Sequence, residues 1–214
     1  AGRLDPMAEG SMILLENQEV HQRDKYLALD KEYLLTILLG VSTDTYDTLG
    51  LITNQNLNLN ISPDSIKKII RKYPRTYLQP YPPYSSKTVN GKPLWYWAKN
   101  NQIDQIKIPT KKVQIKNIKL IKISEQKISI LVKKIINNIK KVKGDFRQKI
   151  IIENWESLVK NHPNQKLTVI SLVISCSTGT YMRSIANNFG RKLQIPTLAL
   201  KIKRNKIGNY KTKN

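Results

Sequence analysis

Residues 167–193 constrain the fold more than any other part of the sequence, because a strand pattern there leads directly into a helix pattern. Residues 167–176 (LTVISLVISC) are rich in Val and Ile, which is typical of buried strands. Residues 177–179 (STG) predict a turn. A helical apolar face follows at Met182, Ile185, Ala186, Phe189 and Leu193. The segment therefore predicts a strand–turn–helix unit.

Two further apolar runs predict strands closer to the N-terminus. Residues 11–15 (SMILL) are too short for a helix and fit a buried strand. Residues 32–41 (EYLLTILLGV) are apolar and β-branched and fit a second strand, whereas the polar residues 43–50 that follow fit a loop. Residues 77–91 (YLQPYPPYSSKTVNG) hold three prolines and several turn formers, which exclude a central strand or a helix interior. We expect an extended loop there.

Two other segments carry helical signals. Ser62 is suited to cap a helix and Pro63 to occupy its first position, and apolar residues follow at helical spacing. A second helical period runs through residues 128–142, stops at residues 143–145 (KGD), and is followed by a further helix reaching Val159. The latter pair predicts a helical hairpin. Together, these strands and helices predict the α+β class and one main domain.

The sequence is strongly basic, with 37 Lys and Arg against 15 Asp and Glu and a formal net charge of +22. Such a charge attracts polyanions, so nucleic acid is the leading class of partner. The alternative is that the lysines serve solubility, or reflect a Lys, Asn and Ile bias in the coding DNA. Nucleic-acid binding is the favoured explanation, because a strongly basic chain is its usual electrostatic signature.

Several other function classes are disfavoured. Cys176 is the single cysteine, so no intrachain disulfide can form and we expect a cytoplasmic protein. His21 and His162 lack neighbours at metal-ligand spacing, so we expect no metal. No apolar run approaches the roughly 18 residues of a membrane span, so we expect no membrane association.

Asp5 is the leading candidate for chemistry. It lies in residues 2–10 (GRLDPMAEG), where two glycines allow a tight turn and Pro6 stiffens the chain after the acid. On local grounds, Asp5 is more readily explained as the cap of a short helix beginning at Pro6 than as a nucleophile. The surrounding residues alone therefore do not assign it a function.

The segment around Asp5 and several later segments resemble, in the same order, the motifs of the TruB family of pseudouridine synthases. The similar segments are residues 2–10 (GRLDPMAEG), 31–33 (KEY), 39–50 (LGVSTDTYDTLG), 79–96 (QPYPPYSSKTVNGKPLWY), 176–184 (CSTGTYMRS) and 202–208 (IKRNKIG). The resemblance implies the pseudouridine synthase catalytic fold, with a mixed, largely antiparallel sheet flanked by helices. It covers most of residues 1–120 and 167–210.

The resemblance also implies roles for individual residues. Asp5 would attack the target uridine, and Arg183 would pair with it and keep it ionised. Tyr33 would stack on the base, Tyr181 would shape the pocket, and Ile202 would form an apolar wall. The implied reaction is isomerisation of a uridine to pseudouridine, at position 55 in the T-arm of tRNA, by a monomer that needs no cofactor.

RNA contacts are expected at Lys87, Lys92 and Arg204, which lie in the motif segments and can neutralise phosphates. The rival hypothesis is a non-catalytic tRNA-binding or RNA-folding protein on the same fold. A generic basic adaptor for ribosomal or other RNA is a third, and it predicts salt-dependent binding without preference for a T-arm hairpin.

The sequence departs from the family pattern in five places. We expect residues 1–210 to form a catalytic domain that lacks the family's N-terminal part, followed by a basic tail at 211–214 without the small C-terminal RNA-binding domain. Residues 124–166, which include the helical hairpin, look inserted between two strands and serve either to grip tRNA or to cover the core. Residues 17–21 replace a Gly-x-x-Thr-Lys segment, and Thr178 stands where many members carry Lys.

Overall fold

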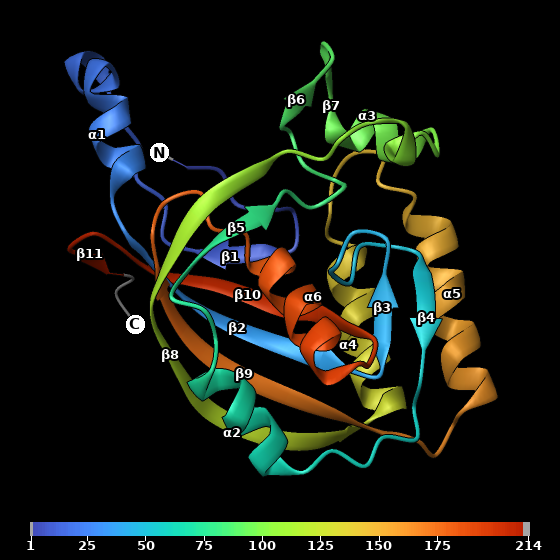
Figure 1. Ribbon diagram of the computed structural model, residues 1–214. Helices are drawn as coiled ribbons and strands as arrows, with labels where there is room; N and C mark the ends of the chain where they lie inside the picture. The colour runs from blue at the N-terminus through green and yellow to red at the C-terminus, as the bar shows by residue number, and fades with distance from the viewer. Residues whose placement is uncertain (1, 212–214) are drawn as a thin grey trace.

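A long curved sheet organises the structure, a computed structural model in which residues 2–211 are described (Figure 1). Within these residues, seven strands pair into the main sheet and two smaller pairs lie outside it. The spatial order is β1 (Ala8–Gly10), β10 (Thr197–Ile207), β2 (Lys31–Leu39), β9 (Lys166–Cys176), β8 (Thr110–Lys127) and β5 (Thr76–Pro80), with β11 (Tyr210–Lys211) beside β10. β1 runs parallel to β10, and the other pairs are antiparallel.

Helices cover both faces of this sheet. α2 (Pro63–Arg71) and α6 (Met182–Leu193) pack on one face, and α4 (Ile128–Ile139) and α5 (Gln148–Asn161) pack on the other. The described residues also form α1 (Arg23–Ala28), α3 (Leu94–Lys99) and 3₁₀ turns at Asn17–Gln22 and Ile103–Gln105. In Figure 1, α6 lies across the near face of the sheet and α5 stands at its right-hand end. The predicted α+β class, with a mixed and largely antiparallel sheet flanked by helices, is confirmed.

The side chains of the central strands alternate between two apolar cores, because successive strand residues point to opposite faces. Leu35 and Ile37 of β2 and Leu172 of β9 belong to the core that packs against α2 and α6. Leu38 and Val169 belong to the core beneath α4 and α5. The helix that follows the Ser-Thr-Gly turn is thereby fixed to the sheet face on which Asp5 lies.

The two predicted helical segments form as expected. Ser62 caps α2, and its hydroxyl accepts a hydrogen bond from the Ser65 amide at 3.2 Å. The hairpin consists of α4 and α5, so its helical part is shorter than the predicted 124–166: β8 extends to Lys127 and β9 begins at Lys166. Trp155 of α5 is fully buried and anchors the hairpin to the core.

Two predictions about the strands need correction. The strand predicted at residues 11–15 is wrong: pairing with β10 is confined to Ala8–Gly10, and the chain then leaves the sheet, leaving Leu14 75% exposed. The predicted loop at 77–91 is partly strand, because Thr76–Pro80 forms the edge strand β5. The rest of it carries a small hairpin of β6 (Thr88–Val89) and β7 (Lys92–Pro93). Prolines are tolerated at a sheet edge, which is why β5 can contain one.

Candidate active site

Asp5 lies in a segment, residues 2–11, that is attached to the sheet at both ends. The Ala8 amide donates to the Asp5 carbonyl at 2.9 Å and closes a tight turn, after which β1 pairs with β10. Gly10 has φ +114°, and a Cβ at this position would overlap the Arg204 carbonyl oxygen. Glycine is therefore required for β1 to approach β10 this closely. The pairing fixes where Asp5 enters the site.

Arg204 holds the two ends of the same segment. It is 2% exposed, and its Nε donates to the Ser11 carbonyl at 2.8 Å while its Nη2 donates to the Gly2 carbonyl at 3.0 Å. From the sequence, Arg204 was expected to contact RNA. Its burial and its backbone partners correct that expectation: Arg204 positions the Asp5 segment from inside the protein.

The structure brings Asp5 and Arg183 together. Arg183, near the start of α6, donates from Nε to Asp5 Oδ2 at 2.8 Å and from Nη2 to Asp5 Oδ1 at 2.9 Å. Such a two-point contact fixes both the distance and the orientation of a carboxylate. The Asp5 side chain is 29% exposed and that of Arg183 only 4%. The carboxylate is thus accessible from outside while its counter-ion is buried behind it.

Two loops hold Arg183 in turn. Nη1 donates to the Thr45 carbonyl at 3.0 Å, and Nη2 donates to the Tyr84 carbonyl at 3.1 Å. Asp47 Oδ2 lies 3.7 Å from Nε, while Oδ1 accepts hydrogen bonds from the Thr45 hydroxyl and the Leu49 amide. The guanidinium therefore has partners on every side and cannot turn away from Asp5 without breaking several contacts.

The charges in this site reinforce each other. Burial acts to lower the pKa of Arg183, but the carboxylates of Asp5 and Asp47 outweigh it, so the pKa is raised. Burial raises the pKa of Asp47, in spite of the Arg183 charge and the Thr45 hydrogen bond. Arg183 is therefore a permanent cation that contacts both carboxylate oxygens of Asp5.

The Asp5 charge acts on both Tyr33 and Tyr181, whereas Ile202 lies in the core on the strand next to β1. Tyr33 lies opposite Arg204 in the pairing of β2 with β10, and Ile202, 4% exposed, pairs with Ala8. Burial raises the pKa of Tyr33 and of Tyr181, and the Asp5 charge adds to both effects. Two aromatic side chains therefore lie within electrostatic reach of the accessible acid, and the expected role of Ile202 as an apolar wall stays a prediction.

Gln79 of β5 fixes Tyr181 through its backbone. The Gln79 Oε1 accepts from the Tyr181 amide at 2.8 Å, and its Nε2 donates to the Tyr181 carbonyl at 3.2 Å. The Tyr181 ring meets the edge of Tyr81 with 5.3 Å between ring centres. Since Gln79 is only 2% exposed, its two hydrogen bonds fix Tyr181, the residue that precedes α6, from inside the protein.

Lys87 and Lys92 lie on the segment that carries β6 and β7, at the top of Figure 1, and both are exposed. Lys87 Nζ is 5.8 Å from the ring centre of Tyr81, and Lys92 Nζ is 4.2 Å from that of Tyr96. Each cation therefore lies over an aromatic face and remains open to solvent. Cations beside aromatic faces are the combination with which nucleic-acid-binding proteins neutralise phosphates and stack on bases.

Other kinds of reactive group are weakly represented. Burial raises the pKa of the Cys176 thiol to about 11, so it is protonated and unreactive at neutral pH. Among residues 2–211, no three His, Cys, Asp or Glu side chains are grouped as metal ligands. In the same part of the chain, no helix is long and apolar enough to cross a membrane. Asp5, 29% exposed and bonded at both oxygens by Arg183, remains the candidate for chemistry.

A family model described as "TruB family pseudouridylate synthase (N terminal domain)" matches residues 1–137. The chain belongs to the TruB family. Among its relatives, "tRNA pseudouridine synthase B" of Mesoplasma florum is 29% identical over all of this chain and 60% of that protein. The protein of the same name from Mycoplasma mycoides subsp. mycoides is 32% identical over all of this chain and 59% of that protein. The chain thus spans about three fifths of these curated relatives.

A solved structure is also similar. A chain in "Crystal Structure of a Cbf5-Nop10-Gar1 Complex" matches with a TM-score of 0.46 and 12% identity, over 88% of this chain and 34% of that one. A likeness at this level carries no argument about the site.

Within this TruB-family chain, the sequence motifs indicated the candidate site but not all of the residues that hold Arg183 and Tyr181 in place. Asp47 and Gln79 lie in motif segments, yet nothing in their local pattern indicated what they would contact. Arg147 lies outside every motif and still reaches the loops around Arg183. A buried partner for Arg183 could have been sought among the acids of residues 43–50, because a buried cation needs one.

Proposed function

We propose that this chain is the catalytic part of a tRNA pseudouridine synthase that isomerises the uridine at position 55 of the T-arm. It would act in the cytoplasm, as a monomer. One observation carries the proposal: the accessible Asp5 carboxylate is held at both oxygens by the buried Arg183. An acid held in this way is positioned for nucleophilic attack.

The proposed reaction needs no second substrate, because it conserves the composition of the nucleotide. The bond between the ribose C1′ and the base N1 breaks, and a bond between C1′ and C5 forms. The proton on C5 is lost, and N1 gains a proton. Asp5 would add to the substrate as a nucleophile and leave again, with Arg183 stabilising its charge when it is free.

Reaching the target base requires it to leave the RNA stack. Extrusion of a base costs about a few kcal/mol, and an aromatic face recovers part of this. In the proposal, Tyr33 supplies that face, while Tyr181 and Ile202 shape the pocket around the base. Lys87 and Lys92 would contact the RNA backbone, and the net charge of +22 would favour the encounter.

The test is conversion of an unmodified tRNA transcript under single-turnover conditions. We expect Asp5→Asn and Asp5→Ala to lower the rate by about 10³-fold or more, while RNA binding persists. Asp64→Asn, which removes a charge on the exposed side of α2, serves as the matched control and should leave the rate unchanged. Turnover retained by Asp5→Ala would overturn the proposal.

The same assay distinguishes the proposed function from the rival hypothesis. A wild-type protein that binds the transcript but never converts it would support a non-catalytic RNA-binding protein on this fold. Competition with a T-arm variant RNA tests specificity: equal competition by every RNA would favour a generic basic adaptor.

A further inference from the structure

The α4–α5 hairpin reaches the active-site loops through one side chain, Arg147. Its Nη1 donates to Asp44 Oδ2 at 2.8 Å, and its guanidinium carbon lies 4.7 Å from the centre of the Tyr84 ring. The Arg147 and Asp44 side chains are 22% and 23% exposed. Because this pair is largely shielded from water, it is stronger than a typical surface salt bridge.

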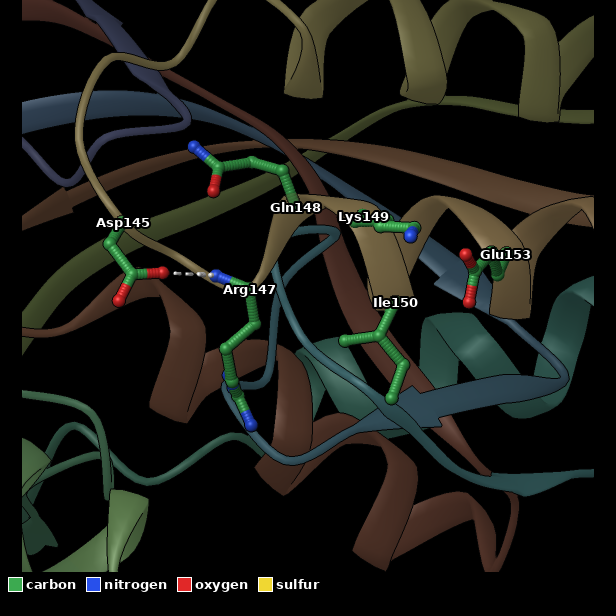
Figure 2. A pocket seen from close by; sticks show the side chains of 6 residues that line it. All are labelled: Asp145, Arg147, Gln148, Lys149, Ile150 and Glu153. Carbon is green, nitrogen blue, oxygen red and sulfur yellow. Dashed lines mark hydrogen bonds between the residues drawn. The ribbon is translucent and has the colours of Figure 1, made fainter.

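The connection between α4 and α5 is shaped to present this arginine. Arg147 itself has φ +62°, a left-handed conformation that is unfavourable for a residue with a side chain. Gln148 stabilises the turn by accepting from the Phe146 amide at 2.9 Å and donating to the Gly144 carbonyl at 2.7 Å. Figure 2 shows the Arg147 side chain pointing away from Lys149 and Glu153, which line the same shallow pocket. Local hydrogen bonds therefore compensate for the strained backbone conformation. This conformation directs the Arg147 side chain toward Asp44 and Tyr84.

The two partners of Arg147 belong to the two loops that hold Arg183. Asp44 accepts a hydrogen bond from the Leu51 amide at 2.9 Å and precedes Thr45, whose carbonyl accepts from Arg183. Tyr84 also contributes a carbonyl to Arg183. Arg147 thus joins the 43–50 loop to the loop that carries Tyr84 at the point where both meet the guanidinium.

The electrostatics of this contact agree with its geometry. Burial raises the pKa of Tyr84 to about 12, the Asp44 carboxylate adds to the effect, and Arg147 opposes it. Burial acts to lower the pKa of Arg147, but the hydrogen bond and charge of Asp44 outweigh it and the net change is upward. Arg147 is therefore charged, and its removal would leave Asp44 without its cation.

We infer that Arg147 is a positioning residue: through Asp44 and Tyr84 it fixes the two loops that orient Arg183 against Asp5. The expected effect of Arg147 on the reaction rate rests on the proposed function, whereas its bracing of the two loops does not. The hairpin then has a part in the reaction beyond covering the core. A hairpin that only covers the core would affect stability alone.

The kinetic test compares Arg147→Ala, Arg147→Lys and the control Lys149→Ala, which removes an exposed cation from the same hairpin. We expect Arg147→Ala to slow single-turnover conversion per folded enzyme by about 10- to 100-fold, with little change in RNA affinity. Arg147→Lys should not restore the rate, because an ammonium cannot both bond Asp44 and stack on Tyr84 as a planar guanidinium does. Lys149→Ala should react like the wild type.

Hydrogen exchange provides a readout that does not depend on activity. In Arg147→Ala, amides of residues 44–51, that of Leu51 above all, should exchange faster than in the wild type, and in Lys149→Ala they should not. Unchanged exchange, or faster exchange with an unchanged rate, would overturn the inference. So would a loss confined to RNA affinity, which would make Arg147 an RNA contact. If the wild type forms no pseudouridine, the proposed function fails and exchange alone decides whether Arg147 braces the loops.

Discussion

At the scale of single residues, Asp47 shows how the site supports a buried cation. Its Oδ1 accepts two hydrogen bonds from its own loop, which directs Oδ2 toward Arg183 at 3.7 Å. The carboxylate is 4% exposed, so its charge is poorly solvated. Asp47 therefore stabilises Arg183 at a cost in its own desolvation, and that cost depends on pH.

We expect Asp47→Asn to keep the hydrogen bonds to Oδ1 and to remove the buried charge. Burial raises the pKa of Asp47 above its ordinary value of about 3.9, so the folded protein binds this proton more tightly than the unfolded chain does. Wild-type stability relative to the variant is therefore greatest below about pH 3.9 and falls as the pH rises through the raised pKa. Urea unfolding of both proteins between about pH 4 and pH 8 measures this difference. A wild-type advantage that grows with pH would contradict it.

Residue pairs far apart in sequence were predicted only where the family resemblance linked them. The resemblance implied that Asp5 and Arg183 meet, and they do so at 2.8 Å. Arg204 was expected to contact phosphate, because arginine is suited to phosphates. It is instead buried and holds backbone carbonyls. No spacing rule indicates whether a guanidinium points out to solvent or inward to carbonyl groups, because that depends on which strands become neighbours.

At the scale of secondary structure elements, the short parallel pairing of β1 with β10 determines where Asp5 lies. Only Ala8, Glu9 and Gly10 take part, opposite Ile202, Lys203 and Arg204. So short a strand has few hydrogen bonds to hold it, and it relies on the close approach that Gly10 permits and on the two contacts of Arg204. The element that carries the proposed nucleophile is thus stabilised largely by neighbouring groups.

Gly10→Ala should therefore weaken both stability and activity. The φ of +114° costs about 1–3 kcal/mol for a residue with a side chain, and the overlap with the Arg204 carbonyl displaces β1 in addition. Gly91→Ala is the matched control, because Gly91 has φ +76° but no atom within 4 Å of the added Cβ. Urea unfolding and single-turnover conversion of both variants should show a loss of stability in each and a loss of rate only in Gly10→Ala. Equal rates in the two variants would refute the positioning role of β1.

Helices and strands with a sustained apolar period were predicted well, whereas short strands were not. The hairpin and the strand–turn–helix unit repeat their apolar spacing over many residues, so both formed as expected. Residues 11–15 are as apolar as a strand but find no partner beyond Gly10, because pairing there is decided by the path of the chain around β10. The edge strand β5 was hidden by its proline-rich neighbours, since β8 supplies the pairing that its own sequence does not indicate.

At the scale of the whole molecule, the positive charge is spread over many exposed lysines, and under the proposed function their positions decide which of them meet RNA. Lys87 and Lys92 belong to the loops next to the proposed site, while Lys67 and Lys68 lie on α2. Tyr84 lies in the same segment as Lys87 and Lys92, and its carbonyl accepts a hydrogen bond from Arg183. Within residues 2–211, the hydrogen-bond partners of Arg183 are Asp5, Thr45 and Tyr84, and none of these belongs to α2. Only charges that face bound RNA release counterions when it binds.

We expect this difference to appear in the salt dependence of tRNA binding. The slope of log affinity against log salt concentration is negative, and the variant Lys87→Gln/Lys92→Gln should reduce its magnitude by about one for each phosphate that is no longer neutralised. The variant Lys67→Gln/Lys68→Gln removes the same charge from α2 and should leave the slope close to that of the wild type. Filter binding over a range of salt concentrations measures both. If the two variants change the slope equally, RNA is attracted by the overall charge alone, and Lys87 and Lys92 are not specific contacts.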